Sequence, residues 1–139
     1  MERLLEFAQE NSQKLSLMHQ SVILAKLRGL VVEQGDSLSA TVRMAAQNHF
    51  HRTARNLLNN THNIDATSLA STINLLAKKD AGMPFQSFKP DRQKCQQIEN
   101  QILAQWELYI NQDISVVASS LMRLDYTPKA MLDSINRMK

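Results

Sequence analysis

One helical pattern occurs twice in this chain, and the repetition limits the folds that the sequence can adopt. The two stretches are NIDATSLASTINLL, residues 63–76, and NQDISVVASSLMRL, residues 111–124, and they align with a constant offset of 48 residues. Each has an aspartate placed to cap a helix, Asp65 or Asp113, followed by small residues and by apolar residues three and four apart. Both stretches therefore predict short amphipathic helices.

A weaker third copy precedes these two. The stretch SLMHQSVILAKL, residues 16–27, fits the pattern with an offset of 49 residues, and Ser16 takes the place of the capping aspartate. Repeats at a fixed interval of about 20–50 residues are typical of helical arrays, in which stacked units supply one another's core. The pattern therefore favours an array of similar helical units.

A second predicted helix precedes each copy. These segments are residues 1–11, 36–60 and 90–112, and the final stretch TPKAMLDSINRMK begins as a further unit would, with Thr127 as a cap and Pro128 at the first helical position. The predicted fold is all-α, with about seven helices arranged as stacked helical hairpins in a short α-solenoid-like array. The alternative is an ordinary all-α bundle, whose amphipathic helices would also look alike.

Composition indicates a single domain over residues 1–139. The chain has three glycines, three prolines and 43% hydrophobic residues, which leaves little material for turns and suits helices. The one substantial linker candidate is KKDAGMPFQSFKPD, residues 78–91. Its Phe85 and Phe88 favour a loop pinned to the core, and a hinge is the alternative.

No targeting or membrane signal is recognisable in the sequence. No run approaches the roughly 18–20 apolar residues that a membrane span needs. Glu2, Glu6 and Glu10 are unlike a secretory signal or a transit peptide. The single cysteine, Cys95, cannot form an internal disulfide and favours a reducing compartment such as the cytoplasm. Export by a signal of another kind is the alternative.

Candidate residues for catalysis are isolated from one another. On a helix, His49 and His51 would point about 200° apart, so they cannot share one metal ion. The cysteine has no histidine nearby in sequence, and no glycine-rich phosphate loop occurs. We therefore predict no catalytic residue, no metal and no cofactor, and expect a protein that is not an enzyme.

Positive charge is concentrated in one predicted helix. The net charge is +3, and RMAAQNHFHRTAR, residues 43–55, contains no acid. Other cations fall near the ends of the repeated helices, where the helix dipole favours them. These observations give a candidate binding face, with ordinary solvated charge as the alternative: Arg43, His51, Arg52, Arg55, Lys78, Lys79 and Arg123.

The repeated segments resemble a known family of helical repeats. SLASTINLLAKK and SVVASSLMRLDYTPKAMLDSI, within Asp65 to Lys79 and Asp113 to Ile135, are similar to octotricopeptide-type repeats and to the related leucine-rich region of FAST-kinase-like proteins. The family usually has a tryptophan where this chain has Asn74 and Met122, and its units are shorter. The resemblance implies stacked α-hairpins with RNA bound along one face.

Two functions are consistent with these features. The first is a non-enzymatic interaction module that binds a protein partner through an extended or grooved surface, where Met83, Met122, Met131 and Met138 would suit an adaptable apolar groove. The alternative is RNA binding by the basic face at residues 43–55 and 78–79, although only 5% of the residues are aromatic and could stack on bases. Self-association, with Trp106 between subunits, is a third reading.

Overall fold

The chain folds into α-helices joined by short connections. The structure, a computed structural model, describes residues 1–11, 14–80 and 83–137. The helices are α1 (Glu2–Glu10), α2 (Leu17–Gln34), α3 (Ala40–Leu58), α4 (Ala66–Leu76), α5 (Arg92–Ala104), α6 (Asn111–Arg123) and α7 (Lys129–Arg137), with 3-10 turns η1 (Gly35–Ser37) and η2 (Trp106–Leu108). No strand occurs in these three ranges, so the predicted all-α fold with about seven helices is confirmed.

Side-chain caps fix the start of four helices. In each, a serine or aspartate oxygen accepts a hydrogen bond of 2.8–3.2 Å from the backbone N–H three residues later: Ser16, Ser39, Asp65 and Asp91. Such a cap satisfies one of the N–H groups that the first turn of a helix leaves free. The caps predicted at Ser16 and Asp65 are therefore confirmed.

The cap predicted at Asp113 is wrong. Helix α6 begins at Asn111, so Asp113 is the third residue of the helix and Ile110 occupies the capping position. The chain reaches α6 directly from the turn η2, and Ile110 is already extended. The Asp113 carboxylate instead accepts a hydrogen bond of 3.3 Å from the Thr67 hydroxyl of α4. In the first turn it still interacts favourably with the helix dipole.

Three other predicted boundaries move. The helix predicted over residues 36–60 begins at Ala40, because Gly35–Ser37 form η1 and Ser39 supplies the cap. The helix predicted over residues 90–112 ends at Ala104, because the backbone turns at Gln105 into η2 and then into α6. Helix α7 begins at Lys129, one residue later than predicted. Pro128 stands before the helix, and its carbonyl accepts the first intrahelical bond, from Leu132 N–H at 2.9 Å.

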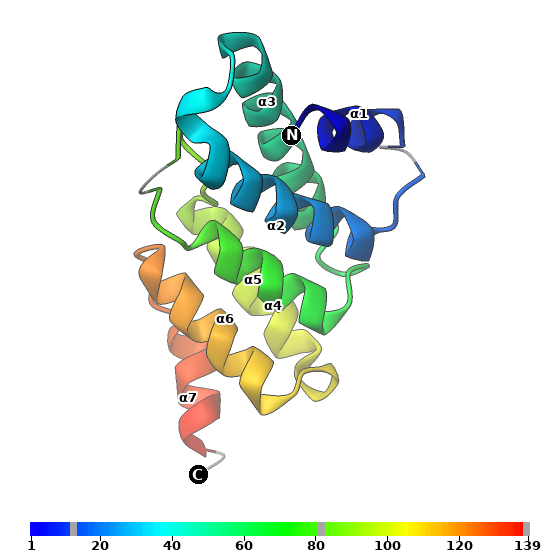
Figure 1. Cartoon of the computed structure of the whole chain (residues 1–139). Coiled ribbons are helices and arrows are strands. Elements are labelled where there is room, and N and C mark those ends of the chain that lie inside the picture. The colour runs from blue at the N-terminus through cyan, green and yellow to red at the C-terminus, as the bar shows by residue number, and fades with distance from the viewer. Residues whose placement is uncertain (12–13, 81–82, 138–139) are drawn as a thin grey trace.

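Helices α2, α4 and α6 lie side by side and run in the same direction (Figure 1). Between α2 and α4, the Ser21 and Thr72 hydroxyls are 2.9 Å apart, and the Arg28 guanidinium donates to the Lys79 carbonyl at 2.8 Å. Each of these pairs is separated by 51 residues in sequence. Helices α2 and α4 are therefore packed in parallel register.

Helices α4 and α6 are packed in parallel in the same way as α2 and α4. Besides the bond between Thr67 and Asp113, the Arg123 guanidinium donates to the Asn74 side-chain oxygen at 2.6 Å. These pairs are 46 and 49 residues apart, close to the offset of 48 in the sequence pattern. The repeated segments are thus direct neighbours in space. Whether they form a true repeat array stays a prediction.

The remaining helices cover this layer and extend it. Helix α3 packs against α2 and α4, α1 packs against α3 and α2, and α5 packs against α7. The buried carboxylate of Glu99 joins α5 to α7, since it accepts from the Tyr126 hydroxyl at 2.6 Å and from Met131 N–H at 3.1 Å. Every helix contributes to one buried apolar cluster. Helices α1 and α7 lie at opposite ends of the molecule (Figure 1).

The loop at residues 78–91 lies against α3. Within it, residues 81 and 82 are outside the described residues. The rings of Phe85 and Phe50 meet edge to face with their centroids 6.2 Å apart, and Phe88 meets His51 at 6.0 Å. A hydrogen bond of 2.8 Å joins His51 Nε2 to the Gln86 carbonyl. The two phenylalanines therefore attach this loop to the fold.

Candidate functional site

The seven residues of the predicted basic face fall in three places. Arg43 is half-buried near the start of α3, and it donates to the Leu38 carbonyl at 3.2 Å. It thus holds the turn that precedes α3. Because much of its side chain is enclosed, Arg43 offers little charge to a ligand.

His51, Arg52 and Arg55 form a second group, on α3 beside the loop. Arg55 lies over the ring of Phe88, with 5.9 Å from its guanidinium carbon to the ring centroid. His51 is half-buried and bonded to the loop backbone. Arg52 and Arg55 are exposed. Two arginines of the predicted face are therefore accessible here.

Lys78, Lys79 and Arg123 form the third group, at the carboxyl ends of α4 and α6. All three are exposed. Arg123 bonds Asn74 and also donates to the Ser120 hydroxyl at 3.0 Å. This group belongs to the layer of α2, α4 and α6, whereas the α3 arginines lie on the helix that packs against that layer.

Two further cations stabilise the end of α4, and the sequence analysis missed both. Arg28 is buried and bonds the Lys79 carbonyl. Lys89 donates to the carbonyls of Leu76 at 2.7 Å and Lys78 at 2.6 Å, and its Nζ lies 3.6 Å from Asp80 Oδ1. Both cations neutralise the negative end of the helix dipole. Only the path of the loop could have revealed these contacts.

The charge balance at this end of α4 involves Asp80. Burial alone would raise the pKa of Asp80, but hydrogen bonds from Ser87 and the charge of Lys89 outweigh it and lower the pKa. Burial lowers the pKa of Lys89, although Asp80 opposes that shift. The cluster is thus internally paired. It holds the loop against the end of α4, and the Lys89 side chain remains partly exposed.

The accessible faces of α2, α4 and α6 carry no charge at nine matching positions, three in each helix. The positions in α4 and α6 are related by the offset of 48, and those in α2 by 49. Eight of these nine residues are exposed and one, Asn74, is half-buried. Gly29 is exposed one turn after Ala25 in α2, but its matching position in α4 is the charged Lys78. We call the nine matching residues together with Gly29 the layer face: Met18, Val22, Ala25 and Gly29 in α2, Thr67, Ser71 and Asn74 in α4, and Ser115, Ser119 and Met122 in α6.

The α2 part of the layer face is apolar. Val22 is 61% exposed and Met18 is 50% exposed, and Val32, one turn beyond Gly29, is 43% exposed. In α6, Met122 is 46% exposed. Solvated helix faces normally carry charged or polar residues. The central part of a protein interface is instead depleted of charged residues, and methionine is enriched there.

The other methionines predicted for an apolar groove lie elsewhere. Met131 is buried in the core and Met83 is half-buried against it. Met138 lies outside the described residues. Trp106 is half-buried in η2, beside a hollow of about 320 Å³, and Leu108 next to it is 68% exposed. Of the apolar residues named in the sequence analysis, Met122 and Trp106 are therefore the ones that lie at accessible places.

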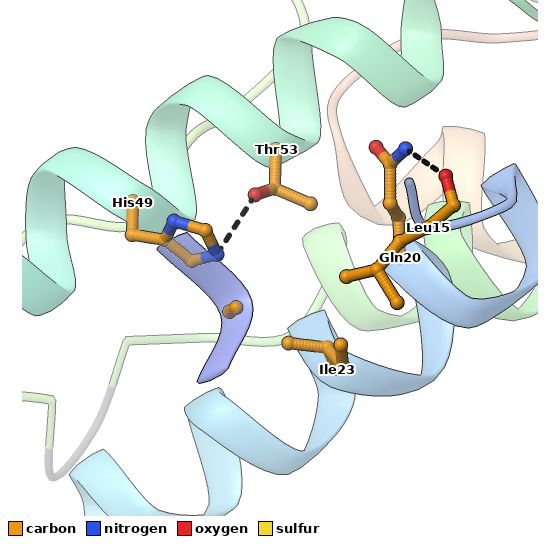
Figure 2. Close-up of a pocket in the computed structure, with 6 residues that line it drawn as sticks. Leu15, Gln20, Ile23, His49 and Thr53 are labelled. Atoms are coloured by element: carbon orange, nitrogen blue, oxygen red, sulfur yellow. Dashed lines mark hydrogen bonds between the residues drawn. The ribbon is translucent and has the colours of Figure 1, made fainter. Parts of the chain in front are cut away.

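A small cavity lies between α1, α2 and α3 (Figure 2). Its volume is about 30 Å³, and its lining includes Gln20, Ile23, His49 and Thr53. The Thr53 hydroxyl and His49 Nε2 are 3.4 Å apart. Burial, and then the charge of Arg52, lowers the pKa of His49. A ligand pocket usually measures about 300–1,000 Å³. This cavity holds at most about one or two waters.

Other reactive side chains are isolated or buried. In the three described ranges, no three residues among His, Cys, Asp and Glu are placed to hold a metal ion. Cys95 is buried, and burial together with Asp91 raises the pKa of its thiol to about 11. A thiol with this pKa remains protonated near neutral pH and is a poor nucleophile.

None of the described helices combines the length and the apolar character that a membrane crossing requires. Comparison of the chain with protein-family models, curated proteins and solved structures gives no match.

Proposed function

We propose that this protein is a non-enzymatic interaction module that binds a protein partner on the layer face. The observation that carries the proposal is the absence of charge at its nine matching positions. Charge is costly to desolvate when a surface is covered, so the central part of an interface is depleted of it. A face built from serine, threonine, alanine and glycine also lets a partner approach the helix backbones closely.

The geometry also supports an extended binding mode. Helices α2, α4 and α6 are parallel and side by side, so the face spans three helices rather than one. Lys26 and Arg123 flank it, and both are exposed. Partners of helical surfaces of this kind are amphipathic helices or extended segments whose apolar residues enter the shallow face. Charged residues at the rim would orient such a partner more than they would hold it.

Comparative capture tests the proposal. The purified chain and a Ser71→Arg/Ser119→Arg variant are used as baits in lysate of the cells that express the protein, and bound proteins are identified by mass spectrometry. We expect at least one protein to bind the original chain and to lose binding by at least about tenfold in the variant, because two arginines obstruct the central face.

The matched control adds the same charge elsewhere. Gln97→Arg/Asn100→Arg places two arginines on exposed positions of α5. This control should capture the same proteins as the original chain, and circular dichroism should show all three folded. Equal capture by all three baits would refute the proposed face. RNA is the competing ligand: salt-sensitive binding of a random RNA pool that is lost in Arg52→Ala/Arg55→Ala, with no protein captured, would replace the proposal.

A further inference from the structure

Gly29 is unusual because nothing in the fold requires a glycine at its position. It lies in the interior of α2 and is exposed, and a Cβ atom added to it would meet no atom within 4 Å. Glycine is among the least favourable residues inside a helix, since its backbone loses the most freedom on folding. A glycine here therefore suggests that something outside this chain approaches the helix closely.

The residues around Gly29 form a notch. Ala25, one turn earlier, is also small and exposed on the same side of α2. Met18 and Val22 precede this pair, and Val32 follows it, all of them substantially exposed. Two small residues one turn apart, with larger apolar residues on either side, allow two helices to cross with their backbones close together.

We propose that two copies of this chain associate through α2, crossing near Ala25 so that Val22 of each copy packs over Gly29 of the other. The inference rests on the proposed function, because it names a second copy as the occupant of the α2 part of the layer face. A close crossing needs small residues on both helices. A second copy supplies the same notch, and a symmetric contact buries both notches at once.

Charge complementarity favours an antiparallel pair. His19, Lys26 and Glu33 flank the stripe at intervals of seven residues, all of them exposed. In an antiparallel crossing, Glu33 of each copy lies beside His19 of the other, and Val22 lies opposite Gly29 of the other. A parallel crossing would instead place Glu33 beside Glu33. In both orientations Lys26 faces its own counterpart, and its long side chain can extend into water.

Sedimentation velocity over a concentration series tests the association. We expect the original chain to shift from monomer to dimer as concentration rises. Gly29→Gln fills the notch and should raise the dimer dissociation constant by at least about tenfold. Its thermal midpoint, measured at a concentration where all chains are monomeric, should be unchanged or higher, because the added side chain meets open space. Ala130→Gln, an exposed change in α7, is the control and should leave the dimer intact.

A charge exchange tests the orientation. Glu33→Lys alone should weaken the dimer, because His19 of the second copy loses the carboxylate that can accept a hydrogen bond from its ring. His19→Glu alone should also weaken it, because two glutamates then meet. An equimolar mixture of the two variants should recover a dimer, since the introduced lysine then lies beside the introduced glutamate at one end, and Glu33 lies beside His19 at the other. Recovery in the mixture supports the antiparallel contact, and its absence overturns it.

The results separate this inference from the proposed function. The proposed dimer is refuted if the chain stays monomeric at several hundred micromolar. It is also refuted if Gly29→Gln leaves the dimer dissociation constant unchanged. If a different protein nevertheless binds the original chain and fails to bind the Ser71→Arg/Ser119→Arg variant, the proposed function is supported without the dimer. If the α2 dimer forms while all baits capture the same proteins, the dimer stands and the wider layer face does not.

Discussion

Helices α4 and α6 share a sequence pattern and differ in their surroundings. Helix α4 lies between α2 and α6, whereas α6 packs mainly against α4. Leu76 of α4 and Leu124 at the end of α6 align in the pattern, but Leu76 is fully buried and Leu124 is half-buried. The pattern therefore sets which side of each helix is apolar, and the neighbouring helices set how much of that side is buried.

The carboxyl ends of these two helices differ as well. The Leu76 carbonyl, the last of α4, and the Lys78 carbonyl just beyond the helix both accept hydrogen bonds from the Lys89 side chain, which comes from the following loop. At the end of α6, the Leu121 carbonyl accepts from Tyr126 N–H at 2.9 Å, and Asp125 between them has a positive φ of 62°. That closure is local, in the manner of a Schellman motif. One helix thus ends through a distant side chain and the other through its own backbone.

The largest expected effect comes from the aligned leucines. Leu76→Ala should lower the free energy of unfolding by about 2–5 kcal/mol, because it leaves a cavity between packed helices. Leu124→Ala should cost about 1–2 kcal/mol, since that side chain is already partly exposed to water and the substitution removes less buried surface. Urea unfolding followed by circular dichroism measures both. Equal losses would show that the two helices are equally buried, contrary to the structure.

An intermediate effect is expected at the end of α4. Lys89→Met keeps most of the side chain's length but removes two hydrogen bonds, so the free energy of unfolding should fall by about 1–3 kcal/mol. Lys129→Met, an exposed change in α7, serves as the control and should be nearly neutral. Chemical denaturation of both variants gives the comparison. A neutral Lys89→Met would mean that α4 ends without help from the loop.

The smallest expected difference concerns the two aspartates. Asp65→Ala removes a side-chain cap and should cost about 0.5–2 kcal/mol. Asp113→Ala removes only a favourable charge in the first turn and the bond with Thr67, so about 0.3–1 kcal/mol is expected. Thermal unfolding of the two variants under identical conditions ranks them. A larger loss for Asp113→Ala would restore it as the more important start signal.

The sequence predicted the helices better than it predicted their contacts. Periodicity and capping residues located α4 and the start of α2, because these signals act within one or two turns. The same reasoning misplaced the start of α6, since Asp113 looks like a cap unless the turn η2 is known. The burial of Arg28 was not predictable either. Its partner is a carbonyl 51 residues away, and no local pattern encodes that pairing.

For the candidate site, too, the sequence showed the local pattern but not the contacts. The uncharged positions of α4 and α6 were visible in the sequence as small residues at the constant offset, but packing against a neighbour was the simpler explanation for them. Only the structure shows that Ser71 and Ser119 point to solvent while Thr72 and Ser120 are buried. The resemblance to octotricopeptide-type repeats stays a prediction.

The sequence by itself determined that this chain is all-helical, where most of its helices lie and which side of each is apolar, because those properties depend on residues within a few turns of one another. The tertiary structure alone decided that α2, α4 and α6 lie in parallel. It also decided which small residues remain exposed and where each cation finds its partner. These outcomes depend on contacts between residues about 50 positions apart, and such contacts exist only once the helices have packed.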